Sequence, residues 1–100
     1  MPRDVRRHPA LDRELRRLPR PVQQTFAAVE AALQQVDRPP AYREQIICSH
    51  RPRRVLHIAQ ARHGGVEFRM AYEIQSDRAL IWKCGAHEGF YAALKRRAGC

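Results

Sequence analysis

Lysine is nearly missing from this sequence, although the chain is strongly basic. Only Lys83 and Lys95 are lysines, so the formal net charge of +9 comes almost wholly from arginine. Guanidinium groups match phosphate geometry and stack on bases, which favours a nucleic acid as partner. A high genomic GC content would also favour arginine over lysine, but it would not by itself produce the net charge.

Long hydrophobic runs are also absent. No stretch approaches the length of a signal peptide or a membrane span, so we expect a cytoplasmic protein without a membrane partner. The 100 residues, of which 44% are hydrophobic, suffice for one core. A single domain over residues 1–100 is therefore expected.

Cysteine is scarce and does not occur in close pairs. Cys48, Cys84 and Cys100 are odd in number and widely spaced, which indicates free thiols in a reducing compartment. Cys48 with His50 and Cys84 with His87 resemble half of a zinc pattern, but structural zinc ligands are usually paired more tightly. Glycine-rich phosphate loops, serine-centred nucleophile motifs and paired carboxylates are missing as well. We therefore expect neither a metal nor a cofactor.

Two amphipathic helices are expected in the first part of the chain. Leu11, Leu15 and Leu18 recur at helical spacing and predict a short helix. Apolar residues then repeat at helical intervals from Val22 to Val36 and predict a longer one. This second helix should end before Pro39-Pro40, because proline restricts the residue before it and lacks a backbone donor.

The hydrophobic period changes to two after Arg53. Residues 55–62, 66–75 and 79–84 predict three strands. Gly64-Gly65 and Ser76-Asp77 are typical of turns, so the strands should form an antiparallel meander.

The remaining segments complete the predicted fold. Residues 39–52 have poor periodicity and are expected to form an irregular loop, and a short helix from about Glu88 to Arg97 closes the chain. The predicted class is α+β, with two N-terminal helices packed on a small antiparallel sheet of three strands.

The middle strand separates apolar from polar residues. Its core face carries Val66, Phe68, Met70, Tyr72 and Ile74, and its other face carries Glu67, Arg69, Ala71 and Glu73. A two-residue turn at Gly64-Gly65 places Arg62 opposite Glu67 and Gln60 opposite Arg69. The second face is therefore expected to be an open, polar surface.

Three motifs and the order of the elements resemble the RelE/ParE superfamily of bacterial toxins. Residues 66–74 (VEFRMAYEI) resemble the family's YRxxYxI strand, residues 85–91 (GAHEGFY) its GxHxxxY/F segment, and residues 15–19 (LRRLP) its LxxLP segment. The resemblance covers nearly the whole chain. It implies a further short strand over residues 4–8, before the first helix.

The resemblance also implies an activity. Toxins of this family in type II toxin–antitoxin systems commonly cleave messenger RNA in the ribosomal A site, without a metal. Arg69 matches the arginine that contacts the reacting phosphate, and His87 and Tyr91 match a C-terminal acid/base pair. The implied partners are RNA, the ribosome and an acidic antitoxin.

The chain departs from the family pattern on the strand before the motif. RelE has closely spaced lysines there, whereas this chain has His57, Gln60 and Arg62. The identity of the general base is therefore open.

The residue types fit this chemistry without the family. Metal-free RNA cleavage needs a base for the 2′-hydroxyl, cationic donors for the phosphate and an acid for the leaving oxygen. Histidine transfers protons near neutral pH, and arginine holds a phosphate in two places. Each residue also has a structural alternative: Arg69 in a surface ion pair, His87 as a helix cap, and Tyr91 in the core.

Further arginines are candidates for binding RNA. Arg53, Arg54 and Arg62 are expected to follow the RNA backbone, whereas His63 beside the glycine turn is expected to be exposed. Two alternatives stay open. A ParE-like inhibitor of DNA gyrase would need no acid/base pair. A non-catalytic basic module would explain why the closely spaced strand lysines of RelE have no counterpart here.

Overall fold

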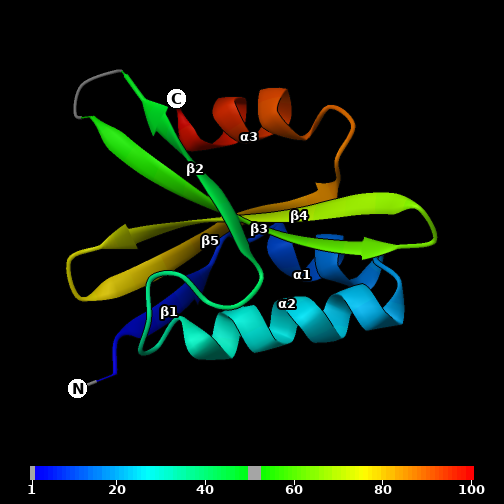
Figure 1. Ribbon diagram of the computed structural model, residues 1–100. Coiled ribbons are helices and arrows are strands. Elements are labelled where there is room, and N and C mark those ends of the chain that lie inside the picture. Colours follow the sequence, from blue (N-terminus) through cyan, green and yellow to red (C-terminus); the bar gives the residue numbers. More distant parts are fainter. Residues whose placement is uncertain (1, 50–52) are drawn as a thin grey trace.

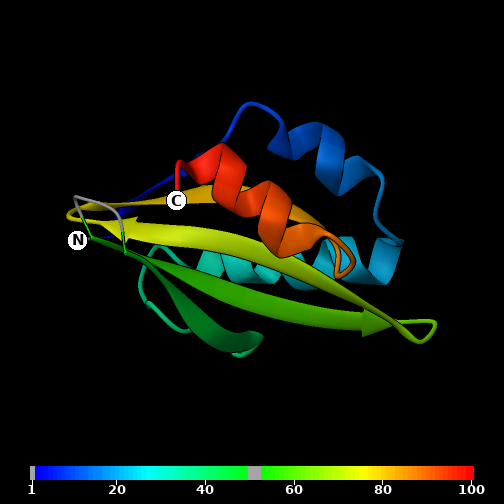
Figure 2. The ribbon, with the colours of Figure 1, turned by 90° about the horizontal axis from the view of Figure 1, so that it is seen from above.

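The fold is a mixed sheet with helices on both faces, in a computed structural model that describes residues 2–49 and 53–100. The elements in chain order are β1 (Asp4–Arg7), α1 (Leu11–Arg16), α2 (Arg20–Ala32), β2 (Tyr42–Cys48), β3 (Arg54–His63), β4 (Val66–Gln75), β5 (Arg78–Ala86) and α3 (Phe90–Ala98). The five strands lie in the order β1-β5-β4-β3-β2, with β1 parallel to β5 and the other pairs antiparallel. Helices α1 and α2 lie on one face and α3 on the other (Figures 1 and 2).

The predicted sheet of three antiparallel strands is wrong. One strand is added at each edge, and the sheet is mixed. β1 covers residues 4–7, where the family resemblance implies a strand, and it runs parallel to β5. β2 lies within the segment expected to be an irregular loop.

The pattern of β2 explains why its sequence did not predict a strand. Tyr42, Glu44, Ile46 and Cys48 are more buried than the residues between them, so the strand does alternate. However, an acidic residue occupies one of the inward positions, and Ile46 and Ile47 are adjacent apolar residues. The register also shifts between Tyr42 and Glu44. These features make the alternation of apolar and polar residues in β2 difficult to recognise from the sequence.

The main core lies between the sheet and the first two helices. The predicted stripe of α2 is buried there, although the helix ends at Ala32 and leaves Val36 exposed. The chain leaves the helix at Leu33, whose backbone N–H still bonds to Val29. The cluster comprises Leu11, Leu18, Val22, Phe26, Val29, Leu33, Ala59, Phe68, Met70, Tyr72, Ala79, Ile81 and Cys84.

The β3–β4 hairpin confirms the predicted register. Gly64 and Gly65 have φ values of +58° and +77°, which only glycine adopts readily in succession. Arg62 pairs with Glu67, and Gln60 pairs with Arg69.

The polar face of β4 is not the open surface that was expected. Helix α3 lies over it, so that Arg69 and Glu73 are buried. A second core cluster forms beneath the helix from Cys48, Leu56, Ile58, Ala71, Phe90, Leu94 and Ala98.

Ionic and backbone contacts hold α3 on the sheet. Arg54 binds both oxygens of Glu73 (3.0 and 3.1 Å) and donates to the carbonyl of Ala98 (2.5 Å). Arg97 donates to the carbonyl of Trp82 (3.0 Å) and to Glu14 of α1 (2.9 Å). A hydrogen bond from Arg54 and an ion pair from Arg97 therefore fix the last turn of the helix.

A disulfide joins Cys48 to Cys100, with 5.1 Å between their Cα atoms. The prediction of free thiols is wrong for these two residues, because the fold brings the end of β2 beside the segment that follows α3. Cys84 is a free thiol, and burial raises its pKa to about 12.

None of the helices in residues 2–49 and 53–100 combines the length and the hydrophobicity that crossing a bilayer would require.

Candidate active site

Arg69 lies in β4 with its side chain beneath α3, where it is only 5% exposed. One terminal nitrogen donates to the hydroxyl of Tyr91 (2.7 Å) and the other to Glu67 (3.1 Å). Its Nε is buried and finds no acceptor among the described residues. A buried donor without a partner is costly. Arg69 therefore retains one donor that an anion could satisfy.

The hydroxyl of Tyr91 connects Arg69 to a carboxylate. It accepts a hydrogen bond from Arg69 and donates one to Glu44 of β2. Burial, followed by the hydrogen bond to Glu44, raises the pKa of Tyr91. The hydroxyl therefore keeps its proton at neutral pH, and a hydrogen-bonded line runs from β4 through α3 to β2.

Glu44 is a candidate functional residue that the sequence did not identify. Its side chain is 40% exposed, and it also lies 3.8 Å from Arg43. The signal that could have found it is the alternation of Tyr42, Glu44, Ile46 and Cys48, which places the carboxylate on the inward face of a strand.

His87 lies just before α3 and is exposed. Its backbone N–H donates to the carbonyl of Glu67 (2.8 Å), and its own carbonyl accepts from Phe90 (3.1 Å). The backbone at His87 is thus fixed to β4 on one side and to the helix on the other.

Two surface hollows of about 440 Å³ meet at His87. One is lined by residues 87–92, including Tyr91. The other is lined by Arg62, Glu67 and His87 together with neighbouring residues. The predicted trio is thus brought together only in part: Arg69 and Tyr91 touch, whereas His87 shares a hollow with Tyr91.

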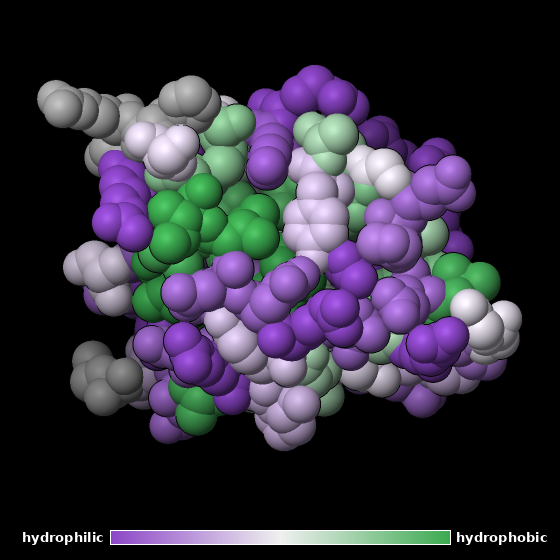
Figure 3. Space-filling model, turned by 45° about the horizontal axis from the view of Figure 1, so that its top comes forward, coloured by the Kyte–Doolittle hydropathy of each residue, from purple (hydrophilic) through white to green (hydrophobic). Residues whose placement is uncertain are grey.

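The surface that carries α3 is mostly hydrophilic but includes a hydrophobic patch (Figure 3). Partly buried apolar residues adjoin the second core cluster, among them Ile46 and Cys100. Charged groups therefore do not cover this side of the molecule completely.

The three predicted RNA-binding arginines differ in their surroundings. Arg53 is exposed, and Arg62 is 65% exposed although it pairs with Glu67 (3.3 Å). Arg54 is engaged by Glu73 and Ala98, so it would reach RNA only if those contacts opened.

Of the β3 residues considered as a general base, His57 faces away from this site. Its Nδ1 lies 3.2 Å from the Tyr42 hydroxyl, and its ring stacks on Tyr72 in the main core. Burial and the nearby Arg38 lower the pKa of His57. Gln60 pairs with Arg69 and has a buried side-chain oxygen without a partner among the described residues. Neither residue belongs to the line of hydrogen bonds from Arg69 to Glu44.

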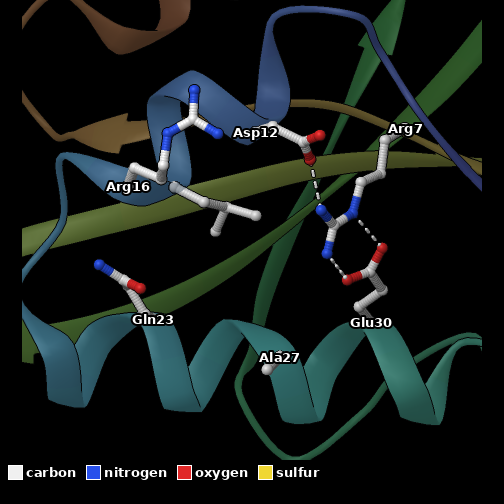
Figure 4. Close-up of a pocket in the computed structure, with 7 residues that line it drawn as sticks. Arg7, Asp12, Arg16, Gln23, Ala27 and Glu30 are labelled. Carbon is white, nitrogen blue, oxygen red and sulfur yellow. Dashed lines mark hydrogen bonds and ion pairs between the residues drawn. The ribbon is translucent and has the colours of Figure 1, made fainter.

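A separate hollow of about 280 Å³ lies between α1 and α2 (Figure 4). Arg7 of β1 extends into it, binds both oxygens of Glu30 (2.6 Å each) and contacts Asp12. The hydrogen bond to Glu30 makes the largest contribution to raising the pKa of Arg7, despite the opposing effect of burial. The ion pairs join β1, α1 and α2, which indicates a structural brace.

The residues considered for zinc do not form a site in the described part of the chain. Cys48 is bonded to Cys100, and His50 lies outside the described residues. No three histidine, cysteine, aspartate or glutamate residues gather at one point within residues 2–49 and 53–100.

No protein-family model matches the chain, and its sequence has no significant match among curated proteins.

Proposed function

We propose that the chain is the toxin of a type II toxin–antitoxin pair and acts as a metal-independent endoribonuclease on messenger RNA, in association with the ribosome. The observation that carries the proposal is the line from Arg69 through Tyr91 to Glu44, with His87 on the adjoining surface. The motifs that resemble the RelE/ParE superfamily contain three of these four residues. They do not contain Glu44.

The charges of the group suit an attack on a phosphodiester. Arg69 has a buried donor that lacks an acceptor, and a non-bridging phosphate oxygen would satisfy it. The positive charge would neutralise the charge that develops on the phosphate in the transition state. A phosphate at Arg69 would replace the Tyr91 hydroxyl as a hydrogen-bond partner.

The proton transfers can be assigned to the remaining residues. Glu44 would take the proton of the 2′-hydroxyl, whose oxygen attacks the neighbouring phosphorus. His87 in its protonated form would give a proton to the departing 5′-oxygen. Tyr91, displaced from Arg69 by the phosphate, would keep its hydrogen bond to Glu44 and so position the base. The products would be a 2′,3′-cyclic phosphate and a 5′-hydroxyl.

The partners in this proposal follow from the charge. A net charge of +9 suits RNA in one state and an acidic antitoxin in another. We place the protein in the cytoplasm, where messenger RNA is translated.

The test is cleavage of translated messenger RNA and of free RNA with a chelator present. Wild-type protein should cut, and His87→Ala should lose about a hundred- to ten-thousandfold in rate with an unchanged melting temperature. His63→Ala, at an exposed histidine at the end of β3 that lines neither hollow, is the matched control. Wild-type protein that cuts neither substrate would contradict the proposal.

A further inference from the structure

The Cys48–Cys100 disulfide connects two elements of the candidate site. Cys48 is the last residue of β2, the strand that carries Glu44, and Cys100 lies two residues beyond α3, the helix that carries Tyr91. The disulfide therefore fixes the end of α3 to the edge strand.

The position of α3 controls access to Arg69. The Tyr91 hydroxyl binds the guanidinium, whose carbon lies 5.1 Å from the centre of the Tyr91 ring. With α3 in place the Arg69 side chain is 5% exposed. An anion of the size of a phosphodiester can reach it only when Tyr91 moves, and Tyr91 moves with its helix.

The short segment that leads into α3 is where the helix can change direction. Residues 86–89 are all exposed, and Gly89 has a φ of +71°, which permits a change of direction there. No side chain caps the start of the helix. A helix of nine residues has little stability by itself, so its position depends on packing and on its connections. Phe90 and Tyr91 hold the first turn through core packing and the hydrogen bonds to Arg69 and Glu44, and Arg54 and Arg97 hold the last turn. The disulfide adds a covalent link at the last turn.

We propose that Cys48 and Cys100 form a reversible thiol–disulfide site that determines whether Arg69 is covered. With the disulfide formed, α3 is held closed. With both thiols reduced, the helix loosens about residues 86–89 and exposes Arg69 and Tyr91. Only the consequence for RNA rests on the proposed function.

The reaction needs a low-molecular-weight thiol of the glutathione class. Cys48 is 2% exposed and Cys100 is partly exposed, so a thiolate attacks Sγ of Cys100. This forms a mixed disulfide and releases Cys48 as a thiolate. A second thiolate attacks the sulfur of the bound small molecule and releases Cys100 as a thiolate with a small-molecule disulfide. Two small-molecule thiols are oxidised while the protein disulfide gains two electrons and two protons. Oxidation by the small-molecule disulfide is the reverse.

The experiment compares the oxidised and reduced full-length chain without RNA. Phenylglyoxal modification of Arg69, followed by mass spectrometry, should be at least tenfold faster after reduction. Hydrogen exchange should rise in α3 but not in β3 or β4. Exposed Arg13 should react equally in both states and serves as the internal control.

Two variants complete the comparison. In Cys48→Ser/Cys100→Ser, the rate of Arg69 modification should equal that of the reduced wild type and should not change when the reductant is added. In Cys84→Ala, the rate should rise on reduction as it does in the wild type. Equal Arg69 reactivity in the oxidised and reduced wild type would overturn the proposal. So would a uniform loss of protection in β3 and β4, since the disulfide would then only stabilise the whole fold.

A parallel assay of RNA cleavage separates the two proposals. Faster cleavage after reduction would support both. A loosened α3 and a reactive Arg69 without cleavage in either state would support the thiol–disulfide site and count against the endoribonuclease.

Discussion

Arg69 is surrounded by groups that can be replaced one at a time, so its role can be tested by mutation. Arg69→Ala should reduce RNA cleavage by about a hundred- to thousandfold, because transition-state charge would lose its main donor. Arg69→Lys should recover only part of the rate, since an ammonium lacks the two-pronged geometry. Single-turnover rates with thermal melting would check both. Full activity in Arg69→Lys would mean that charge alone matters.

The Tyr91 hydroxyl can be separated from its ring. Tyr91→Phe keeps the packing but removes the bridge between Arg69 and Glu44. We expect about a tenfold loss of cleavage with little loss of stability, because Glu44 would lose the hydroxyl that positions it. Phe90→Leu, which alters the neighbouring ring beneath α3, is the packing control. An unchanged rate and pH profile in Tyr91→Phe would show that only the ring is needed.

Arg53 and Arg54 are adjacent in sequence but should contribute differently to the stability of the fold. Arg54→Met should lower the free energy of unfolding by about 3 kcal/mol, because Glu73 would remain buried without its ionic partner. Arg53→Gln, at an exposed position, should change stability by less than about 0.5 kcal/mol. Urea denaturation of both variants would measure the difference. Equal effects would contradict the assigned role of Arg54.

At the scale of elements, two largely buried carboxylates, Glu14 and Glu73, help to connect α3 to the rest of the fold through the arginines that they bind. Burial opposes ionisation of Glu14, but hydrogen bonds from Arg97 and Lys83 outweigh it and lower the pKa. Glu73 follows the same pattern, with Arg54 and Trp82 as donors. The folded protein thus stabilises the ionised form of both carboxyl groups.

This arrangement predicts a loss of stability in acid. Each carboxyl has a lower pKa when folded than when unfolded, where it is about 4.3, so the unfolded chain binds more protons as the pH falls. The stabilisation is complete above the unfolded pKa and is lost as the pH falls through the pKa values of the folded protein. Unfolding midpoints between about pH 3 and 6 would show the decline. Glu14→Gln should flatten it, whereas Glu88→Gln should not.

The elements also show where sequence reasoning succeeds. Gly64-Gly65 specifies a tight hairpin, so the pairing of Arg62 with Glu67 could be predicted. The apolar stripe of α2 could also be predicted, because the helical spacing of its residues is a local feature of the sequence. Strand β2 was not predicted, because the inward position of Glu44 is explained only by its hydrogen bond to Tyr91. That residue lies 47 positions away in the sequence. The Cys48–Cys100 bond likewise depends on long-range placement that residue spacing does not reveal.

At the scale of the molecule, the positive charge should dominate binding to RNA. Each phosphate contact releases counterions, so affinity should fall steeply with salt. Arg53→Gln/Arg62→Gln should weaken binding to all sequences alike and reduce the logarithmic salt slope by about 1.4. Arg78→Gln, at the beginning of β5, is the control. Binding titrations at several salt concentrations would measure the slopes. Dependence on one base identity would contradict backbone recognition.

The parallel pairing of β1 with β5 has a consequence for how the chain reaches its native state. Asp4 pairs with Arg78, and Arg7 pairs with Ile81. A ribosome therefore makes β1 long before its neighbour exists, and contacts of such separation slow folding. The hairpin of β3 and β4 can form early, but Tyr91 is added only after β5. A nascent chain would thus hold Arg69 and Glu44 without the residue that joins them, and the complete constellation would arise only after α3 has been synthesised.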